Sequence, residues 1–153
     1  MTSAMPYRRV LAVDPGRKRV GLAAADALGI ALTPIGILEG GAGVESRIAE
    51  AVRQECVDAV VIGHPLNMDG SEGEQAAAAR CLAGKLAEML PSVHVYLWDE
   101  RLSSYEAEDV LAKAGLKPGR NKAQVDVMSA KLILRSFMDA VRSGRTPAPL
   151  EPE

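Results

Sequence analysis

The chain has 153 residues, of which 48% are hydrophobic and 25% charged, which fits one globular domain and excludes wholesale disorder and fibrous repeats. Only 3% of the residues are aromatic, so we expect an aliphatic core and exclude recognition of nucleic acid by several stacked aromatic rings. The formal net charge of −2 argues only weakly against a polyanionic ligand, because basic residues are concentrated near the two ends of the chain.

Three extended stretches open the chain. Residues 8–14 contain a short apolar run that ends at a Pro15-Gly16 turn, which is typical of a central strand. Residues 19–25 resume with alternating apolar positions, and residues 30–38 form the third stretch. Because tight turns join these segments, we predict an antiparallel meander.

From residue 44 the spacing of apolar residues alternates between helical and extended. Four further elements are predicted: a helix that begins at residue 44, a strand over residues 57–62, a helix over residues 74–90 and a strand over residues 93–98. This alternation is typical of β-α-β units, in which strands pair in parallel.

The last third of the chain is predicted to be helical. Residues 103–106 match a capping box, so a helix is expected from there to about Ala114. Residues 125–141 carry helical apolar spacing, and residues 143–153, with three prolines, are expected to form a flexible tail. One domain over residues 1–142 is therefore expected, with an α/β fold: a mixed five-stranded sheet, its first three strands antiparallel, flanked by helices.

The cysteine pattern and the apolar runs indicate a cytoplasmic protein. Cys56 and Cys81 are the only cysteines, and neither lies in a CxxC pair, so neither a disulfide framework nor a zinc site is expected. No apolar run approaches the roughly 20 residues that cross a bilayer, and the first nine residues lack the features of a signal peptide. We expect no membrane partner.

Three acidic residues occupy similar places in the pattern. Asp14 ends an apolar strand, Glu100 follows another, and Asp126 begins an apolar helix. Carboxylates gathered at strand ends repel one another unless a cation or a shared proton offsets their charge, and Mg²⁺ or Mn²⁺ suits such oxygen ligands. The alternative is structural: Asp14 starts a turn, Glu100 pairs with Arg101, and Asp126 caps the last helix.

Basic residues surround the first of these acids. Residues 8–22 contain five Lys or Arg against Asp14, and residues 113–145 contain eight against two acids. If the two regions meet in space they form a phosphate-binding patch; otherwise they are solvated faces. Gly16 lets a phosphate approach the backbone of the turn, but a similar turn also binds ATP phosphates in actin-like folds, so the turn indicates phosphate without deciding the reaction.

Four motifs, at residues 14–21, 63–72, 99–104 and 121–130, resemble the bacterial YqgF family, also called RuvX-like Holliday junction resolvases. The resemblance covers residues 10–141. It implies an RNase H-like fold, metal-dependent nuclease activity, and a substrate that is either a four-way DNA junction or the precursor 5′ end of 16S ribosomal RNA.

Carried over position by position, the family pattern implies that Asp14, Glu100 and Asp126 are the catalytic acids. They would bind Mg²⁺ or Mn²⁺, with two ions present when substrate is bound. Asp99 is a possible fourth acid, although strand alternation favours a structural role for it. Related junction resolvases place two acids on the last helix, whereas only Asp126 is acidic in the first turns of this one.

Eight polar or basic residues are candidates for binding nucleic acid: Arg17, Lys18, Arg19, Asn67, Ser71, Arg101, Arg120 and Lys122. Each has an alternative. Asn67 would help to build a tight turn, Ser71 would cap the next helix, and Arg101 would pair with Glu100. His64 stands where the family usually has an apolar residue and is expected to be a surface substitution, and His94 is expected to face solvent.

The main hypothesis is an endonuclease in which a metal-activated water cleaves phosphodiester bonds and leaves 5′-phosphate and 3′-hydroxyl ends. It would either resolve Holliday junctions in DNA recombination and repair or process pre-16S rRNA in ribosome biogenesis. Paired incision of a junction would require a homodimer, whereas rRNA trimming would not. The alternatives are a non-catalytic nucleic-acid-binding module and an ATP-binding, actin-like domain.

Overall fold

Five strands form one mixed sheet in the order β3-β2-β1-β4-β5. This computed structural model describes residues 7–26, 32–102, 122–145 and 149–150, without the side chains at 102 and 122–126. The strands are β1 (Arg9–Asp14), β2 (Arg19–Asp26), β3 (Leu32–Glu39), β4 (Ala59–His64) and β5 (His94–Asp99). β1, β2 and β3 pair antiparallel, whereas β1, β4 and β5 run parallel. The predicted fold class is confirmed.

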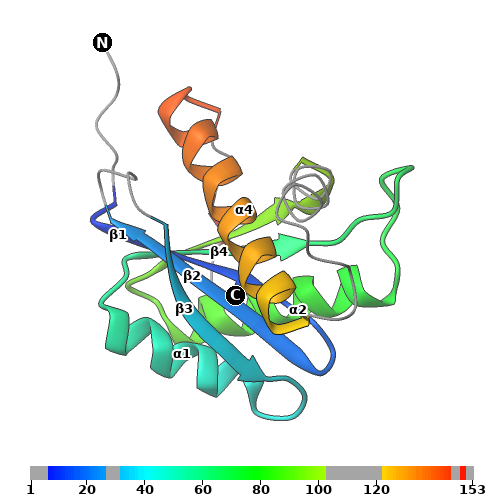
Figure 1. Cartoon of the computed structure of the whole chain (residues 1–153), viewed down its shortest axis with the longest axis horizontal. Coiled ribbons are helices and arrows are strands. Elements are labelled where there is room, and N and C mark those ends of the chain that lie inside the picture. The colour runs from blue at the N-terminus through cyan, green and yellow to red at the C-terminus, as the bar shows by residue number, and fades with distance from the viewer. Residues whose placement is uncertain (1–6, 27–31, 103–121, 146–148, 151–153) are drawn as a thin grey trace.

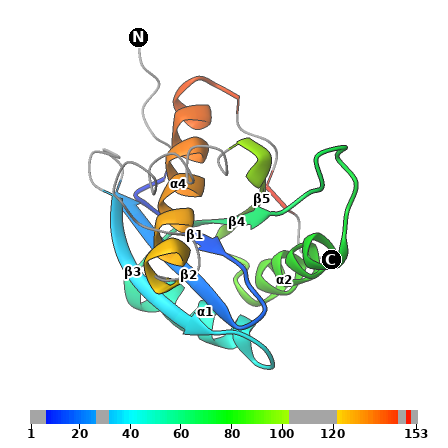
Figure 2. The same ribbon diagram turned by 45° about the vertical axis from the view of Figure 1, so that its right-hand side comes forward.

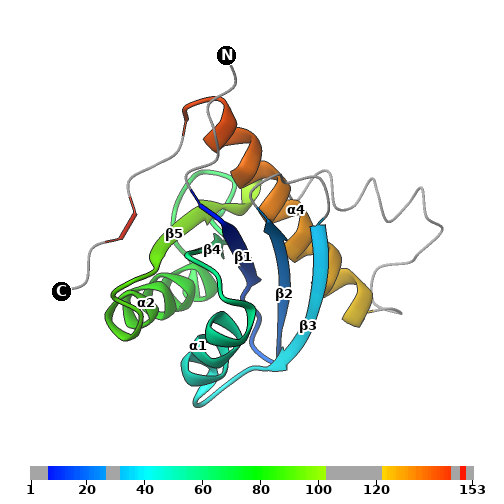
Figure 3. The ribbon, with the colours of Figure 1, turned by 90° about the vertical axis from the view of Figure 1, so that its left-hand side faces the viewer.

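Helices cover both faces of the sheet. α1 (Val44–Glu55) and α2 (Glu74–Met89) lie on one face and α4 (Lys122–Arg142) on the other (Figures 1 and 3). A 3₁₀ helix, η1 (Glu100–Leu102), follows β5, and the helix expected from residue 103 lies outside the described residues. In the described part of the chain, no helix combines the length and the apolar character that a membrane span requires.

The two faces of the sheet are packed with different side chains. The α1 and α2 face is aliphatic, with Leu11 and Ile62 fully buried in it. On the α4 face, Trp98 and Phe137 meet edge to face with ring centroids 5.6 Å apart, and the indole Nε1–H of Trp98 donates to Ser136 Oγ at 3.0 Å. The expected aliphatic core is confirmed for the first face. Most buried residues of the second face are aliphatic too, but strand alternation turns the aromatic Tyr96 and Trp98 of β5 toward α4, where they pack with Phe137.

The outer edge of β5 carries the last described residues of the chain. The Leu150 N–H donates to the Val95 carbonyl at 2.7 Å, and the Leu150 side chain packs against the aliphatic cluster. Figure 3 shows this short segment beside β5. The flexibility expected for residues 143–153 stays a prediction. Within this range, Pro149 and Leu150 lie against the edge of the sheet.

Candidate metal and nucleic-acid site

The carboxyl ends of three parallel strands meet at one edge of the sheet. Asp14 is the last residue of β1, His64 is the last of β4, and Glu100 directly follows β5. The strand register pairs Gly63 with Trp98 and His64 with Asp99, so the ends of β4 and β5 are level. Open sheets of parallel strands bind ligands outside this edge, because successive loops converge there.

Gly63 makes room for the side chain of Glu100. A Cβ atom built on Gly63 would lie 2.4 Å from Glu100 Oε1 and 2.7 Å from Ile133 Cδ1, and real Cβ atoms do not come that close to their neighbours. The Glu100 carboxylate therefore lies against the backbone of β4, on the side of the sheet that α4 covers. A glycine at this position allows an acid that follows β5 to reach toward β1.

Asp14 and Glu100 meet across this gap and share a hydrogen bond. Such a bond between two carboxyl groups requires one proton between them. Burial raises the pKa of Glu100 above its ordinary value of 4.5. The hydrogen bond with Asp14 and the nearby His64 lower this pKa, and the nearby Asp99 carboxylate raises it. Two adjoining carboxylates are the oxygen ligands that Mg²⁺ and Mn²⁺ prefer, so a divalent cation fits in place of the shared proton.

Asp126 lies in the first part of α4. It precedes buried Ala130 by four residues and Ile133 by seven, so the helical repeat puts its position on the face of α4 that packs on the sheet. Ile133 contacts the Gly63 position beside Glu100, which places the Asp126 backbone about 10 Å further along the helix axis. The Asp126 side chain lies outside the described groups, and its role as a ligand stays a prediction.

No three His, Cys, Asp or Glu side chains within the described ranges gather closely enough to hold a metal ion. Of the expected triad, the structure describes the side chains of Asp14 and Glu100, which the fold brings together although they are 86 positions apart in sequence.

Arg101 pairs with Asp99. Its Nε and Nη2 donate to the Asp99 carboxylate at 2.7–3.1 Å, and its backbone N–H donates to Asp99 Oδ1 at 2.9 Å. This guanidinium group lowers the pKa of Asp99. Arg101 Nη1 also donates to the Met68 carbonyl at 3.2 Å. Asp99 thus has the structural role that alternation suggested, and Arg101 forms an ion pair with Asp99, a partner that sequence analysis did not consider. Contact of Arg101 with nucleic acid stays a prediction.

The loop from residue 65 to residue 73 projects beside this edge of the sheet (Figure 2). Asn67 Nδ2 donates to Ser71 Oγ at 2.9 Å, and the Ser71 hydroxyl donates to Asp69 Oδ1 at 2.5 Å. These bonds build a tight turn, the alternative considered for Asn67. Ser71 does not cap α2, because Gly73 is the N-cap residue and no side chain caps it. Contact of Asn67 and Ser71 with nucleic acid stays a prediction.

His64 and Glu72 belong to the site although sequence analysis assigned them no part in it. The His64 side chain is only 16% exposed, and its Nε2 lies 2.9 Å from Glu72 Oε2, which also accepts a hydrogen bond from Arg80 Nε at 2.9 Å. His64 is therefore a half-buried residue that anchors the loop through Glu72 rather than a surface substitution. A loop without helix or strand structure separates His64 from Glu72, so no periodic pattern signals the pair. His94 is exposed, as expected.

The turn between β1 and β2 presents the basic residues. Gly16 is required there, since a Cβ atom on it would lie 2.4 Å from the Arg19 carbonyl oxygen. Arg17 and Lys18 are exposed, Arg19 is half-buried, and the Gly40 N–H donates to the Lys18 carbonyl at 2.9 Å, which braces the turn. This turn follows Asp14 directly, so its cations lie at the same edge of the sheet as the two acids.

The other basic residues near the ends of the sequence lie away from this turn or outside the described residues. Arg9, at the opposite end of β1, pairs with Glu55 at 2.6 Å, so it does not extend the patch. Arg120 lies outside the described residues, and Lys122 begins α4 with its side chain undescribed. Whether the two basic regions of the sequence join stays a prediction.

Comparisons with known proteins show the family to which the chain is similar. A family model described as RuvX, Holliday junction resolvase, matches residues 8–140. A protein of Syntrophus aciditrophicus named "Putative pre-16S rRNA nuclease" is 38% identical over 143 residues, which cover 92% of this chain and 94% of that protein. A protein of the same name from Anaeromyxobacter sp. strain K is 44% identical over 134 residues, covering 86% and 96%.

Solved structures share the fold. Thermus thermophilus RuvC in complex with Holliday junction substrate matches with a TM-score of 0.61 and 19% identity, covering 93% of this chain and 99% of that chain. The fowlpox virus Holliday junction resolvase matches with a TM-score of 0.56 and 14% identity, covering 87% and 99%. At these identities the likeness concerns the fold, which is the RNase H-like fold expected from the sequence.

Proposed function

Because the chain belongs to the RuvX family of Holliday junction resolvases, we propose that it is a metal-dependent endonuclease acting on structured nucleic acid. The observation that carries the proposal is the meeting of Asp14 and Glu100 over Gly63, at the edge of the sheet where the basic turn begins. A purely structural pair of carboxyl groups would gain nothing from burial, which raises the free energy of their charged forms.

Asp14, Glu100 and Asp126 are proposed to hold Mg²⁺ or Mn²⁺, two ions when substrate is bound. The metal, when bound, supplies an activated water and neutralises charge on the phosphate. The exposed cations of the β1–β2 turn bind neighbouring phosphates without reading sequence, and Arg101 holds the 65–73 loop against the site. The half-buried Glu100 carboxylate lies against the backbone of β4, which limits its motion and keeps a metal ligand in place.

Two substrate classes are proposed, and each draws on a comparison. The family model is described as a Holliday junction resolvase, and the curated relatives carry the name of a pre-16S rRNA nuclease. Resolution of a junction requires two active sites on one substrate and therefore a homodimer. Trimming of ribosomal RNA requires one site and places the protein in the cytoplasm, where bacterial rRNA is processed.

The test is cleavage of a labelled four-way DNA junction and of a pre-16S rRNA fragment by purified protein with Mn²⁺. Asp14→Asn should abolish cleavage of the preferred substrate and leave the circular dichroism spectrum unchanged. Glu88→Gln, on an exposed position of α2, is the matched control and should cleave like the unmodified chain. Full activity of Asp14→Asn would refute the metal site, and metal-independent binding without any cleavage would favour a binding module.

A further inference from the structure

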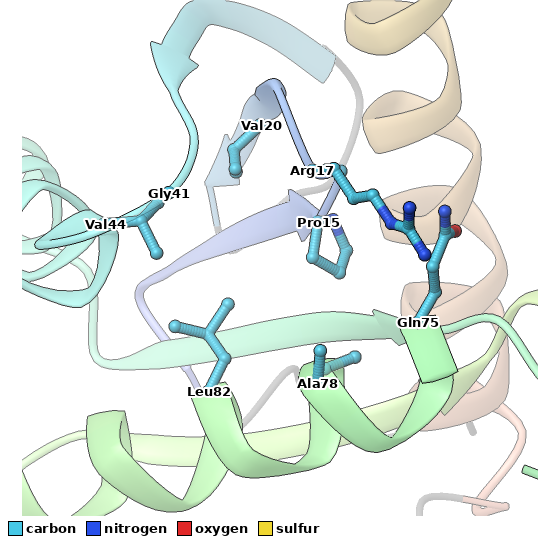
Figure 4. A pocket seen from close by; sticks show the side chains of 10 residues that line it. Pro15, Arg17, Val20, Gly41, Val44, Gln75, Ala78 and Leu82 are labelled. Atoms are coloured by element: carbon cyan, nitrogen blue, oxygen red, sulfur yellow. The ribbon is translucent and has the colours of Figure 1, made fainter. Parts of the chain in front are cut away.

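A pocket lies on the other side of the basic turn from the two acids. It has a volume of about 270 Å³ and is enclosed by the β1–β2 turn, the start of α1 and the first half of α2 (Figure 4). Pro15, Val20, Val44 and Leu82 give it apolar walls. The turn thus separates this pocket from the acidic site, with Pro15 directly following Asp14.

The pocket and the acids use opposite faces of the same sheet edge. On β1, Val13 packs in the cluster under α1 and α2, and alternation directs the next residue, Asp14, to the α4 face. Val20 and Leu82, which line the pocket, belong to the same cluster as Val13. A polynucleotide that crosses the turn therefore has the acids on one side of its path and the pocket on the other.

The mouth of the pocket is polar. Figure 4 shows the side chains of Arg17 and Gln75 pointing toward one another at one end, away from the apolar walls. Arg17 also pairs with Glu74 at 3.1 Å, with 66% and 87% of the two side chains exposed. An ion pair so exposed contributes little, so the Arg17 guanidinium is available to a phosphate or to the face of a planar group.

The size and chemistry suit a single nucleobase. A dry cavity of about 150 Å³ holds one benzene molecule, so 270 Å³ accommodates a one-ring or two-ring base. Apolar walls contact the flat faces of a base, a Gln amide donates to and accepts from its edge, and a guanidinium plane stacks on it. Exposed Ala78 at the rim is small enough to leave the entrance open.

We propose that this pocket receives one unstacked nucleobase of the strand whose phosphates lie along the β1–β2 turn. The inference rests on the proposed nuclease function and adds a substrate requirement: the strand must present an unpaired base near the cleaved bond. Single-stranded flanks and branch points do so, whereas an uninterrupted duplex would first have to release the base.

The experiment measures binding and cleavage of substrates carrying one abasic nucleotide, moved stepwise along the strand on both sides of the branch point or processing site. Ala78→Leu fills the entrance, and Cys81→Leu adds the same side chain to an exposed position of α2 outside the pocket. Binding is measured by fluorescence anisotropy with Asp14→Asn as the background, so that it does not depend on cleavage. A mononucleotide is titrated by calorimetry as a separate arm.

One abasic position should weaken binding about tenfold, and Ala78→Leu should remove that difference while Cys81→Leu retains it. A scan with no sensitive position, or a sensitivity that persists in Ala78→Leu, would overturn the inference. Mononucleotide binding that Ala78→Leu blocks, together with a flat scan, would assign the pocket to a free nucleotide and overturn its assignment to the substrate strand. Loss of all Mn²⁺-dependent cleavage in the unmodified chain would instead refute the proposed nuclease.

Discussion

The substitution Gly63→Ala tests how the candidate metal site is built. An alanine Cβ would lie 2.4 Å from Glu100 Oε1, whereas ordinary contacts begin at 3.4 Å, so the carboxylate oxygen would have to retreat by about 1.0 Å. Ile133 Cδ1, at 2.7 Å, blocks part of the space into which the side chain would move. The change therefore displaces a proposed metal ligand without removing it.

The expected loss is much larger for activity than for stability. Overpacking costs about 1–3 kcal/mol, and alanine in extended backbone recovers about 0.4–1 kcal/mol through the unfolded state, because Gly63 does not have a positive φ. A displacement of about 1 Å in a catalytic group can reduce a rate about 100-fold. Gly63→Ala should therefore unfold close to the original temperature while losing most of its cleavage activity and Mn²⁺ affinity.

Mn²⁺ calorimetry, junction or rRNA cleavage and thermal unfolding measure the three quantities on one preparation. Gly84→Ala is the matched control, since nothing lies within 4 Å of a Cβ built on Gly84 in α2. It should stabilise the helix by about 0.8–1 kcal/mol and leave activity unchanged. If Gly63→Ala binds Mn²⁺ and cleaves like the unmodified chain, the close approach of Glu100 to β4 does not position the ligand, and the reasoning fails.

Three further predictions concern the same edge of the sheet and the core beneath it. Because burial raises the pKa of Glu100, its proton stabilises the folded metal-free protein at low pH, and this contribution is lost as the pH rises from 4.5 through the raised value. In urea unfolding with EDTA, Glu100→Gln should therefore gain stability relative to the unmodified chain over that interval, and parallel pH profiles would contradict this. Arg101→Lys cannot reproduce the paired bonds to a carboxylate, so hydrogen exchange around Met68 should accelerate while α2 stays protected; unchanged exchange would count against the tether. Ser136→Ala removes the partner of the Trp98 indole and should cost about 1–2 kcal/mol in thermal unfolding, with a shift in tryptophan fluorescence; an unchanged melting temperature would show that the bond is dispensable.

The sheet was predictable because its signals are local. A short apolar run that ends at Pro15-Gly16 marks a strand, and a longer helical pattern that ends at Pro91 marks a helix. Neither signal depends on the rest of the chain. The parallel direction of β4 and β5 was expected because a helix precedes each of them and parallel strands need such a crossover connection, whereas the pairing of β4 with β1 was not predicted.

The site was predictable only in outline. That Asp14 and Glu100 meet was expected from their places at strand ends, but the gap at Gly63 that permits it depends on which strands are neighbours. The pairing of His64 with Glu72 likewise depends on the path of a loop, which no periodic pattern encodes. Which acid pairs with Arg101 depends on the directions of the side chains at the end of β5, and the partner is Asp99.

The hydrogen bond from Leu150 to Val95 has a consequence for the protein at high concentration. β5 is an outermost strand, and its free backbone groups could template the addition of a strand from another molecule. The chain's own Pro149 and Leu150 occupy part of that rim, and a proline has no N–H with which to recruit a further strand. Pro149 and Leu150 therefore cover backbone groups of β5 near Val95 that would otherwise be free to pair with a strand of another molecule.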